Sequence, residues 1–377
     1  MRWSLYSLRT AIVGAAVSTL LLTGSGGGWA SEPATGVQPL LNGAVVRPHL
    51  DTPANPTPRQ IHLPNANTAR LLTSQELTVP SHLRLMVFAP HPDDETLAAG
   101  GLIQRVLATA GEVRIIFVTN GDGYVDGVRR EVRRTRTSTT DFIHYGERRH
   151  NEALQALARL ALAPSNAVFL GFPDDGIDDL WAGHWSTQKP YTSPYTRFAH
   201  PPYKESLSRQ VEYAGTDLES EITHTLRDFQ PDWVLMPDPR DRHPDHCTTG
   251  VFVLDALRKL RSDAGGRFGR TQVLTYLVHY PDYPASPTWV KEIAGAGVGG
   301  SSTAGRALSA TRWLNLPLTS SELARKREAL GEYQSQLLVM HPFLKQFLVN
   351  DELFGQLDGT QVETVPHEYA LRFRRPH

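Results

Sequence analysis

Short apolar runs of strand length alternate with stretches of helical periodicity along most of this chain, and this alternation constrains its fold more than any other feature. Leu83–Ala89 and Val113–Thr119 are mostly apolar, as expected of strands buried on both faces. Between them, residues 95–110 repeat apolar positions at helical spacing. Strand, helix and strand in this order form a right-handed parallel unit in nearly all cases.

The alternation continues to about residue 340. Further strands are predicted over 168–170, 233–236 and 273–278, and further helices over 147–162, 217–229, 246–260 and 320–339, the last capped by Ser320 or Ser321. We therefore predict an α/β fold, Rossmann-like and layered, in which helices flank a mainly parallel sheet.

The first thirty residues have the features of a secretory signal peptide. Arg2 and Arg9 precede the apolar run 10–22, which is short for a membrane span. Gly28-Trp29-Ala30 then supplies the small residues of a cleavage site. We expect residues 1–30 to be removed on export to a periplasmic or extracellular location, leaving no stable membrane span. An uncleaved anchor is the alternative.

The remaining chain divides by composition. Residues 31–80 are rich in Pro, Asn and Thr and are predicted to be an extended leader, whereas 81–377 are predicted to form the folded domain. Two stretches interrupt that domain. The long loop 174–215 is polar and aromatic, and a loop of this length tends to be functional. The glycine-rich stretch 294–305 is predicted to be a flexible connection.

Charge and cysteine content exclude several classes of protein. The 377 residues carry 38 Lys and Arg against 39 Asp and Glu, so the chain has no basic footprint for nucleic acid. A single cysteine, Cys247, excludes an intrachain disulfide framework and a zinc site built from several thiolates. The sequence does not predict an oligomeric state.

Two clusters of metal-binding residue types follow predicted strands. Residues 90–95 read Pro-His-Pro-Asp-Asp-Glu, and 243–246 read His-Pro-Asp-His. In open α/β sheets, ligands bind at the carboxyl ends of strands, where both clusters fall. A catalytic zinc takes three protein ligands and leaves one position open, and these clusters can supply them. A simpler interpretation is that Asp93 or Asp94 caps the following helix.

These motifs resemble those of the PIG-L/LmbE-like zinc-dependent N-deacetylases, enzymes that remove acetyl groups from N-acetylglucosamine-type substrates. The resemblance extends to Asn120-Gly121-Asp122-Gly123, to Arg149 and Glu152 followed by the segment 170–174, and to the segment 326–336. It covers residues 81–355, although 177–215 and 281–310 fit poorly. Some members carry Tyr-Gly where this chain has Asp241-Arg242.

The resemblance implies a role for each residue of the two motifs. His91, Asp94 and His246 would bind Zn²⁺, with Fe²⁺ or another divalent transition metal as the alternative. Asp93 would be the general base, His243 would stabilise the developing negative charge, and Asp245 would orient His243 and keep it protonated. The implied function is hydrolysis of an N-acetylated sugar. A hydrolase of another amide or ester, and a non-catalytic carbohydrate-binding protein, are the alternatives.

Several residues permit two interpretations. Cys247 could be a fourth ligand or a small buried side chain, and His279 could face the site or be structural. Arg149 and Glu152 could form only a helical pair. Arg240 and Arg242 could bind an anionic group or solvate a loop. The aromatic residues of 174–215 could stack on sugar rings, which we favour, or anchor the loop.

Overall fold

The structure is a computed structural model that describes residues 75–372, except 209, 263–265, 281–282 and 285–310. The predicted signal peptide 1–30, the leader as far as residue 74 and the glycine-rich stretch 294–305 lie outside the described residues. No helix in the described part of the chain is both long and apolar enough to cross a membrane.

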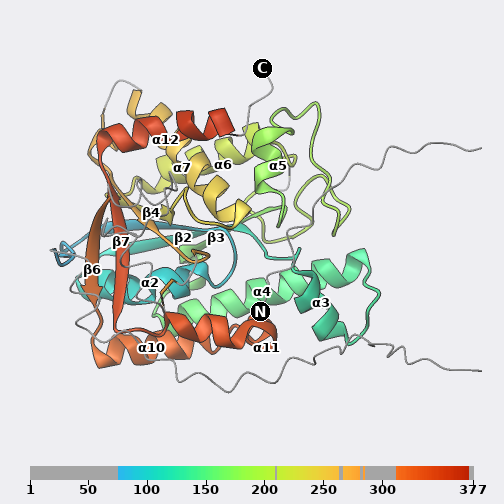
Figure 1. Ribbon diagram of the computed structural model, residues 1–377, viewed down its shortest axis with the longest axis horizontal. Coiled ribbons are helices and arrows are strands. Elements are labelled where there is room, and N and C mark those ends of the chain that lie inside the picture. The colour runs from blue at the N-terminus through green and yellow to red at the C-terminus, as the bar shows by residue number, and fades with distance from the viewer. Residues whose placement is uncertain (1–74, 209, 263–265, 281–282, 285–310, 373–377) are drawn as a thin grey trace, which may run out of the picture. The chain divides into compact units, whose positions relative to one another are not determined.

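Within this part of the chain, seven strands form one sheet in the order β3-β2-β1-β4-β5-β7-β6 (Figure 1). The strands are β1 Arg84–Ala89, β2 Glu112–Thr119, β3 Ala167–Phe172, β4 Trp233–Pro237, β5 Gln272–Tyr276, β6 Arg312–Pro317 and β7 Asp351–Leu357. Strands β1 to β5 pair in parallel, which confirms the predicted mainly parallel sheet. β7 and β6, which the sequence analysis did not predict, extend it in antiparallel fashion.

Helices cover both faces of the sheet. The described helices are α2 Asp94–Ala108, α3 Val125–Val132, α4 Thr139–Arg159, α5 Ile177–Ala182, α6 Gly215–Phe229, α7 Pro244–Ser262, α10 Ser320–Leu330, α11 Gln334–Leu344 and α12 Gly359–Arg372. Three short 3₁₀ turns are η1 Pro164–Asn166, η2 Phe268–Arg270 and η3 Lys345–Phe347. In Figure 1, α5, α6, α7 and α12 lie above the sheet, and α2, α4, α10 and α11 lie below it.

Strand β1 shows why the sheet is buried on both faces. Its side chains alternate between the two faces. Leu85, Val87 and Ala89 belong to the core between the sheet and α2, whereas Met86 and Phe88 belong to the core between the sheet and α7. All five are fully buried. A strand that contributes to two cores must be apolar at every position, which is the pattern that predicted it.

The late helix is broken, contrary to the prediction of one helix over 320–339. α10 ends at Leu330 and α11 begins at Gln334, and the N-cap is Thr319, which forms a capping box with Glu322. Tyr333, between the two helices, is fully buried and donates its hydroxyl to Glu95 of the first motif. The break therefore brings the chain into contact with the first turn of α2, directly after the loop that follows β1.

The loop 174–215 is anchored mainly by its aromatic residues. It contains the short helix α5, and Trp181, Tyr191 and Tyr203 are buried. The Trp181 ring packs edge-on against Phe252 of α7 at 5.0 Å. Of the two interpretations, anchoring is the correct one for these three side chains, because buried rings cannot stack on a sugar.

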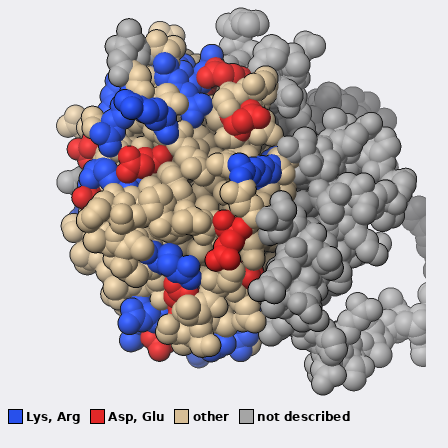
Figure 2. All heavy atoms as spheres, turned by 90° about the vertical axis from the view of Figure 1, so that its left-hand side faces the viewer, with Lys and Arg blue, Asp and Glu red and all other residues tan. Residues whose placement is uncertain are grey.

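Both edges of the sheet are partly covered by other chain segments. Glu76 forms a bridge with Asn315 of the edge strand β6, and Ser206 forms one with Phe169 of β3. Such contacts occupy some of the hydrogen-bonding groups that a bare edge exposes. On the face shown in Figure 2, Lys and Arg occur together with Asp and Glu, in keeping with the near-zero net charge.

A buried ion pair fixes the C-terminal elements to the helix that follows the first motif. Lys326 Nζ of α10 lies 2.7 Å from Glu352 Oε1 of β7, and both side chains are 2% exposed. Glu352 also accepts the backbone N–H groups of Gly101 and Leu102 in α2. One carboxylate therefore joins α2, α10 and β7.

We expect Lys326→Met to lower the free energy of unfolding by about 3–5 kcal/mol, because it leaves the charge of Glu352 buried and unpaired. Lys326→Met/Glu352→Gln should cost much less than the sum of the two single changes, since no uncompensated charge remains. Urea denaturation of the three variants measures both quantities. Additive single effects, or a cost for Lys326→Met below 1 kcal/mol, would contradict this account.

Candidate metal centre

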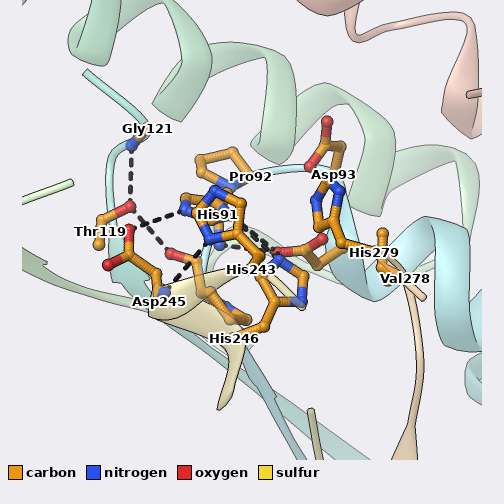
Figure 3. A network of polar contacts seen from close by, with 12 residues as sticks. His91, Pro92, Asp93, Thr119, Gly121, His243, Asp245, His246, Val278 and His279 are labelled. Atoms are coloured by element: carbon orange, nitrogen blue, oxygen red, sulfur yellow. Dashed lines mark hydrogen bonds and ion pairs between the residues drawn. The ribbon is translucent and has the colours of Figure 1, made fainter. Parts of the chain in front are cut away.

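The two histidine- and aspartate-rich motifs meet at one point of the sheet. β1 pairs directly with β4, so the loops after these neighbouring strands leave the same edge. Figure 3 shows His91, His243 and His246 gathered there beside Asp93, with His279 arriving from the end of β5. Residues about 150 positions apart in the sequence are thus brought together by strand pairing alone.

Three potential ligand atoms form a nearly equilateral triangle. Asp94 Oδ2 lies 3.3 Å from His91 Nδ1 and 3.2 Å from His246 Nε2, and the two nitrogens are 3.3 Å apart. Ligands bound to a tetrahedral zinc at about 2.0–2.1 Å lie about 3.3–3.4 Å from one another. All three residues are buried. The donor set and its spacing therefore fit a zinc ion or a similar divalent metal.

A second set of potential ligands shares His91. His91, His243 and Asp245 also place ligand atoms within 4.8 Å of one another. In that set, Asp245 Oδ2 faces the other ring nitrogen of His91, at 3.2 Å, and already accepts the backbone N–H of Asp175. The first set matches the tetrahedral spacing and is the better candidate for one resident ion.

The outer nitrogen of His91 is held by two carboxylates. Its Nε2 lies 3.1 Å from Asp174 Oδ1 and 3.2 Å from Asp245 Oδ2. Burial by itself lowers the pKa of His91, but Asp174 and these hydrogen bonds raise it well above the ordinary value. Carboxylates behind a ligating histidine fix its tautomer and its orientation. Here they direct Nδ1 toward the triangle.

Asp245 therefore does not have the surroundings that the sequence analysis expected. Its carboxylate contacts His91 and the backbone N–H groups of Asp175 and Ile177, whereas only its backbone N–H reaches His243, at Nδ1 (3.2 Å). Burial, together with the charge of His91, lowers the pKa of His243 to about 4. The charge of Asp245 acts in the expected direction and raises the pKa of His243, but burial and the charge of His91 outweigh it in this arrangement. The role of Asp245 toward His243 stays a prediction.

Asp93 occupies a strained position next to the triangle. Its φ of 133° is in a region that residues other than glycine rarely adopt. It makes no side-chain capping hydrogen bond, so the capping interpretation does not account for it. Its backbone N–H donates to Glu95 Oε2, and its Oδ1 lies 3.6 Å from Arg149. Burial raises the pKa of Asp93 well above the ordinary value, and the charge of Arg149 opposes that rise.

Arg149 ties together the loops after β1 and β2. Its guanidinium donates to the carbonyls of Gly121 and Pro92. Glu152 instead accepts hydrogen bonds from Arg148 and Ser335. Arg149 and Glu152 therefore do not form the helical pair considered above. Gly121 has a φ of 65°, and a Cβ there would lie 1.8 Å from the guanidinium. Only glycine allows this close approach.

His279 lies at the centre, as one interpretation of the sequence proposed. Its ring is 4.8 Å from that of His246 and 5.0 Å from that of His243, and its other face stacks on Phe343. Asp241 Oδ2 accepts the backbone N–H of His279 and lies 3.8 Å from His246 Nδ1. Asp241 thus links the end of β5 to a ligand of the triangle.

The remaining candidates lie outside the triangle. Cys247 Sγ is 3.3 Å from the carbonyl of Pro244, and its side chain packs against the core that includes α7. The guanidinium of Arg240 donates one hydrogen bond of 2.6 Å to each carboxylate oxygen of Asp238. Arg242 is exposed, with its guanidinium 5.8 Å from the Tyr280 ring.

Sequence comparison now identifies this region. Residues 86–257 match the family described as PIG-L: GlcNAc-PI de-N-acetylase. They form a PIG-L domain. This domain contains every ligand of the triangle, together with Asp93, Asp174 and His243.

Individual relatives of the PIG-L domain are distant. Two 1D-myo-inositol 2-acetamido-2-deoxy-alpha-D-glucopyranoside deacetylases, from Mycobacterium sp. strains KMS and JLS, are 30% identical over 179 residues, which cover 47% of this chain and 50% of theirs. The chain thus spans about half the length of the curated relatives it matches.

Two solved structures align over most of the chain. N,N'-diacetylchitobiose deacetylase from Pyrococcus horikoshii is 18% identical, with a TM-score of 0.40 and coverage of 74% of this chain and 85% of that one. The A40926 pseudoaglycone deacetylase Dbv21 is 16% identical, with a TM-score of 0.45 and coverage of 73% and 96%.

Asp174 is the site residue that the sequence analysis did not single out. It follows β3, at the same carboxyl edge of the sheet as the two motifs, and its Oδ2 accepts the backbone N–H of Gly123 while Oδ1 faces His91. The signal was its position directly after a predicted strand. The acidic segment 174–179 contains no histidine, so it did not resemble the two motifs.

The buried carboxyl group of Asp122 gives a prediction for stability against pH. Asp122 is 2% exposed, and burial together with the charge of Asp174 raises its pKa from 3.8 to about 7. Folding therefore favours the neutral form of Asp122. The protonated carboxyl group stabilises the fold fully below about pH 4, and this stabilisation is lost as the pH rises toward 7. Asn cannot ionise and can still accept the hydroxyl of Tyr203, which Asp122 accepts.

We therefore expect Asp122→Asn to raise the Tm relative to the unmodified protein, with a difference that grows from pH 4 to pH 7 and then levels off. The limiting gain is at most about 4 kcal/mol for a shift of this size. Thermal unfolding at several pH values measures it, with the exposed Asp126→Asn as the control. A difference independent of pH would refute the assignment.

Proposed function

We propose that this protein is an exported, zinc-dependent hydrolase that removes an acetyl group from an N-acetylated amino sugar, yielding the free amine and acetate. The observation that carries the proposal is the buried triangle of His91, Asp94 and His246 inside a PIG-L domain. The deacetylase names of the relatives are consistent with it. Zinc is proposed because the donor set and spacing fit it, as they would also fit Fe²⁺.

Zinc at the triangle would supply a water of lowered pKa and would polarise the amide carbonyl. The chain supplies the proton transfers. We assign Asp93 as the general base, because its carboxylate lies beside the triangle without being part of it. A base of raised pKa is better matched to neutral pH than an ordinary aspartate. Arg149 and Glu95 position it through the contacts described above.

His243 is assigned to the negative charge that develops on the acetyl oxygen. The backbone N–H of Asp245 donates to its Nδ1, so a neutral ring carries its proton on Nε2. That N–H group can donate to the oxyanion without the ring being charged. This differs from the protonated His243 expected from the sequence, but it preserves the same role.

Export is proposed from residues 1–30 alone. N-terminal sequencing of the protein from cell-envelope and medium fractions should begin near Ser31. An intact Met1 in the cytoplasmic fraction would contradict the proposal.

The adjacent residues Asp93 and Asp94 provide the test of mechanism. We expect Asp94→Ala to lose both metal and deacetylation, because it removes one corner of the triangle. Asp93→Asn should retain metal but lose roughly 10²–10⁴-fold in turnover, the usual contribution of a positioned base. His243→Ala should also retain metal and lose roughly 10²–10³-fold. Elemental analysis and acetate release from N-acetylated sugars measure the two properties for each variant.

The pair of aspartates also provides its own control, since both are buried and neighbouring. If Asp93→Asn emptied the site while Asp94→Ala retained metal, the two assignments would be reversed. An unchanged rate for Asp93→Asn would exclude it as the base. Hydrolysis of simple esters but of no N-acetylated sugar would reassign the substrate class.

A further inference from the structure

One aromatic side chain of the loop 174–215 is anchored and still keeps part of its surface exposed to solvent. Tyr195 is only partly buried, in contrast to Trp181, Tyr191 and Tyr203. Its hydroxyl donates to Asp175 Oδ2 at 2.7 Å, and its ring packs against Phe142 at 5.3 Å. The side chain is therefore held at both ends while part of its surface faces solvent.

Two sets of contacts connect Tyr195 to the two carboxylates that hold the outer nitrogen of His91. Through its hydroxyl it reaches Asp175, whose backbone N–H donates to Asp245 Oδ2, the atom that faces His91. Through its ring it lies against Gly123, where a Cβ would come within 2.9 Å of Tyr195 Cε2. Gly123 donates in turn to Asp174, which also faces His91.

Asp175 is exposed next to this ring, and its backbone N–H contacts Asp245 on the side of His91 that faces away from the triangle. Its φ of 56° is a left-handed conformation that aspartate tolerates better than most residues. An aromatic face and a carboxylate acceptor side by side suit a pyranose ring, which presents C–H groups on one face and hydroxyl donors at its edge. An extended acyl chain carries no hydroxyl group that could donate a further hydrogen bond to this carboxylate.

We propose that Tyr195 and Asp175 form a subsite for the sugar unit linked to the one that carries the scissile acetamido group. This inference rests on the proposed deacetylase function and adds the side from which the sugar is recognised. The Tyr195 ring covers the apolar face of the sugar, and Asp175 accepts a hydroxyl hydrogen bond. The pair is thus specificity-determining and takes no part in proton transfer.

The test compares two substrates with each variant. The first is N,N'-diacetylchitobiose, and the second is N-acetylbutylamine, an acetamide without a sugar. We expect Tyr195→Ala to raise KM for the disaccharide roughly tenfold, with kcat for both substrates little changed. Tyr195→Phe retains the ring and should raise KM less, whereas Asp175→Asn, which tolerates the same backbone conformation, should also raise KM for the disaccharide alone.

Phe198→Ala is the matched control, because Phe198 is an exposed aromatic residue of the same loop whose ring packs against His200. It should leave KM for both substrates unchanged. Metal content and Tm of each variant establish that the fold and the triangle are intact.

The outcomes separate this inference from the function on which it rests. If the unmodified protein releases acetate from neither substrate, the proposed function fails. If it deacetylates the disaccharide but Tyr195→Ala and Asp175→Asn behave like Phe198→Ala, the function stands and the subsite is overturned. Equal losses on both substrates with lowered Tm would show that Tyr195 is only structural, and would overturn the subsite as well.

Discussion

The parallel pairing of β1 with β4 is the constraint on which the site depends. The register Leu85↔Trp233, Met86↔Val234, Val87↔Leu235 aligns two strands that are far apart in the sequence. It brings their following loops to one edge, so that His91 and Asp94 meet His246 at 3.2–3.3 Å. A shift of two residues in this register would displace one loop by about 7 Å relative to the other. The three ligand atoms would then lie too far apart to bind one metal ion.

Gathering so many ionisable groups out of water is costly, and the surrounding structure compensates in specific ways. Asp94 is paired with His91 and His246, which hold its pKa well below the ordinary value despite burial. Asp241 accepts three backbone N–H groups, from His243, Val278 and His279. A divalent ion at the triangle would offset much of the remaining negative charge. The centre is thus a network in which few groups can be replaced singly without leaving a buried charge unpaired.

The sequence predicted what depends on local pattern. The buried strands, the helices after them and the two motifs all follow from residue spacing within short windows, and the α/β sheet follows from their order. The same reasoning missed β6 and β7, because their pairing is antiparallel and joins segments that a local pattern does not connect. It missed Asp174 for a similar reason: only the tertiary structure shows that this carboxylate, and not its neighbour Asp175, faces His91. It did not show that the carboxylate of Asp245 contacts His91, because the choice between His91 and His243 is set by three-dimensional packing.

The central claim is that one metal ion is held by His91 Nδ1, Asp94 Oδ2 and His246 Nε2. Anomalous diffraction at the zinc absorption edge, from crystals of the metal-loaded protein, tests it most directly. The account predicts one strong peak at about 2.0–2.2 Å from each of these three atoms, with Asp93 and His243 beyond bonding distance. A peak bound instead by His243 and Asp245, or by Asp93, would contradict it.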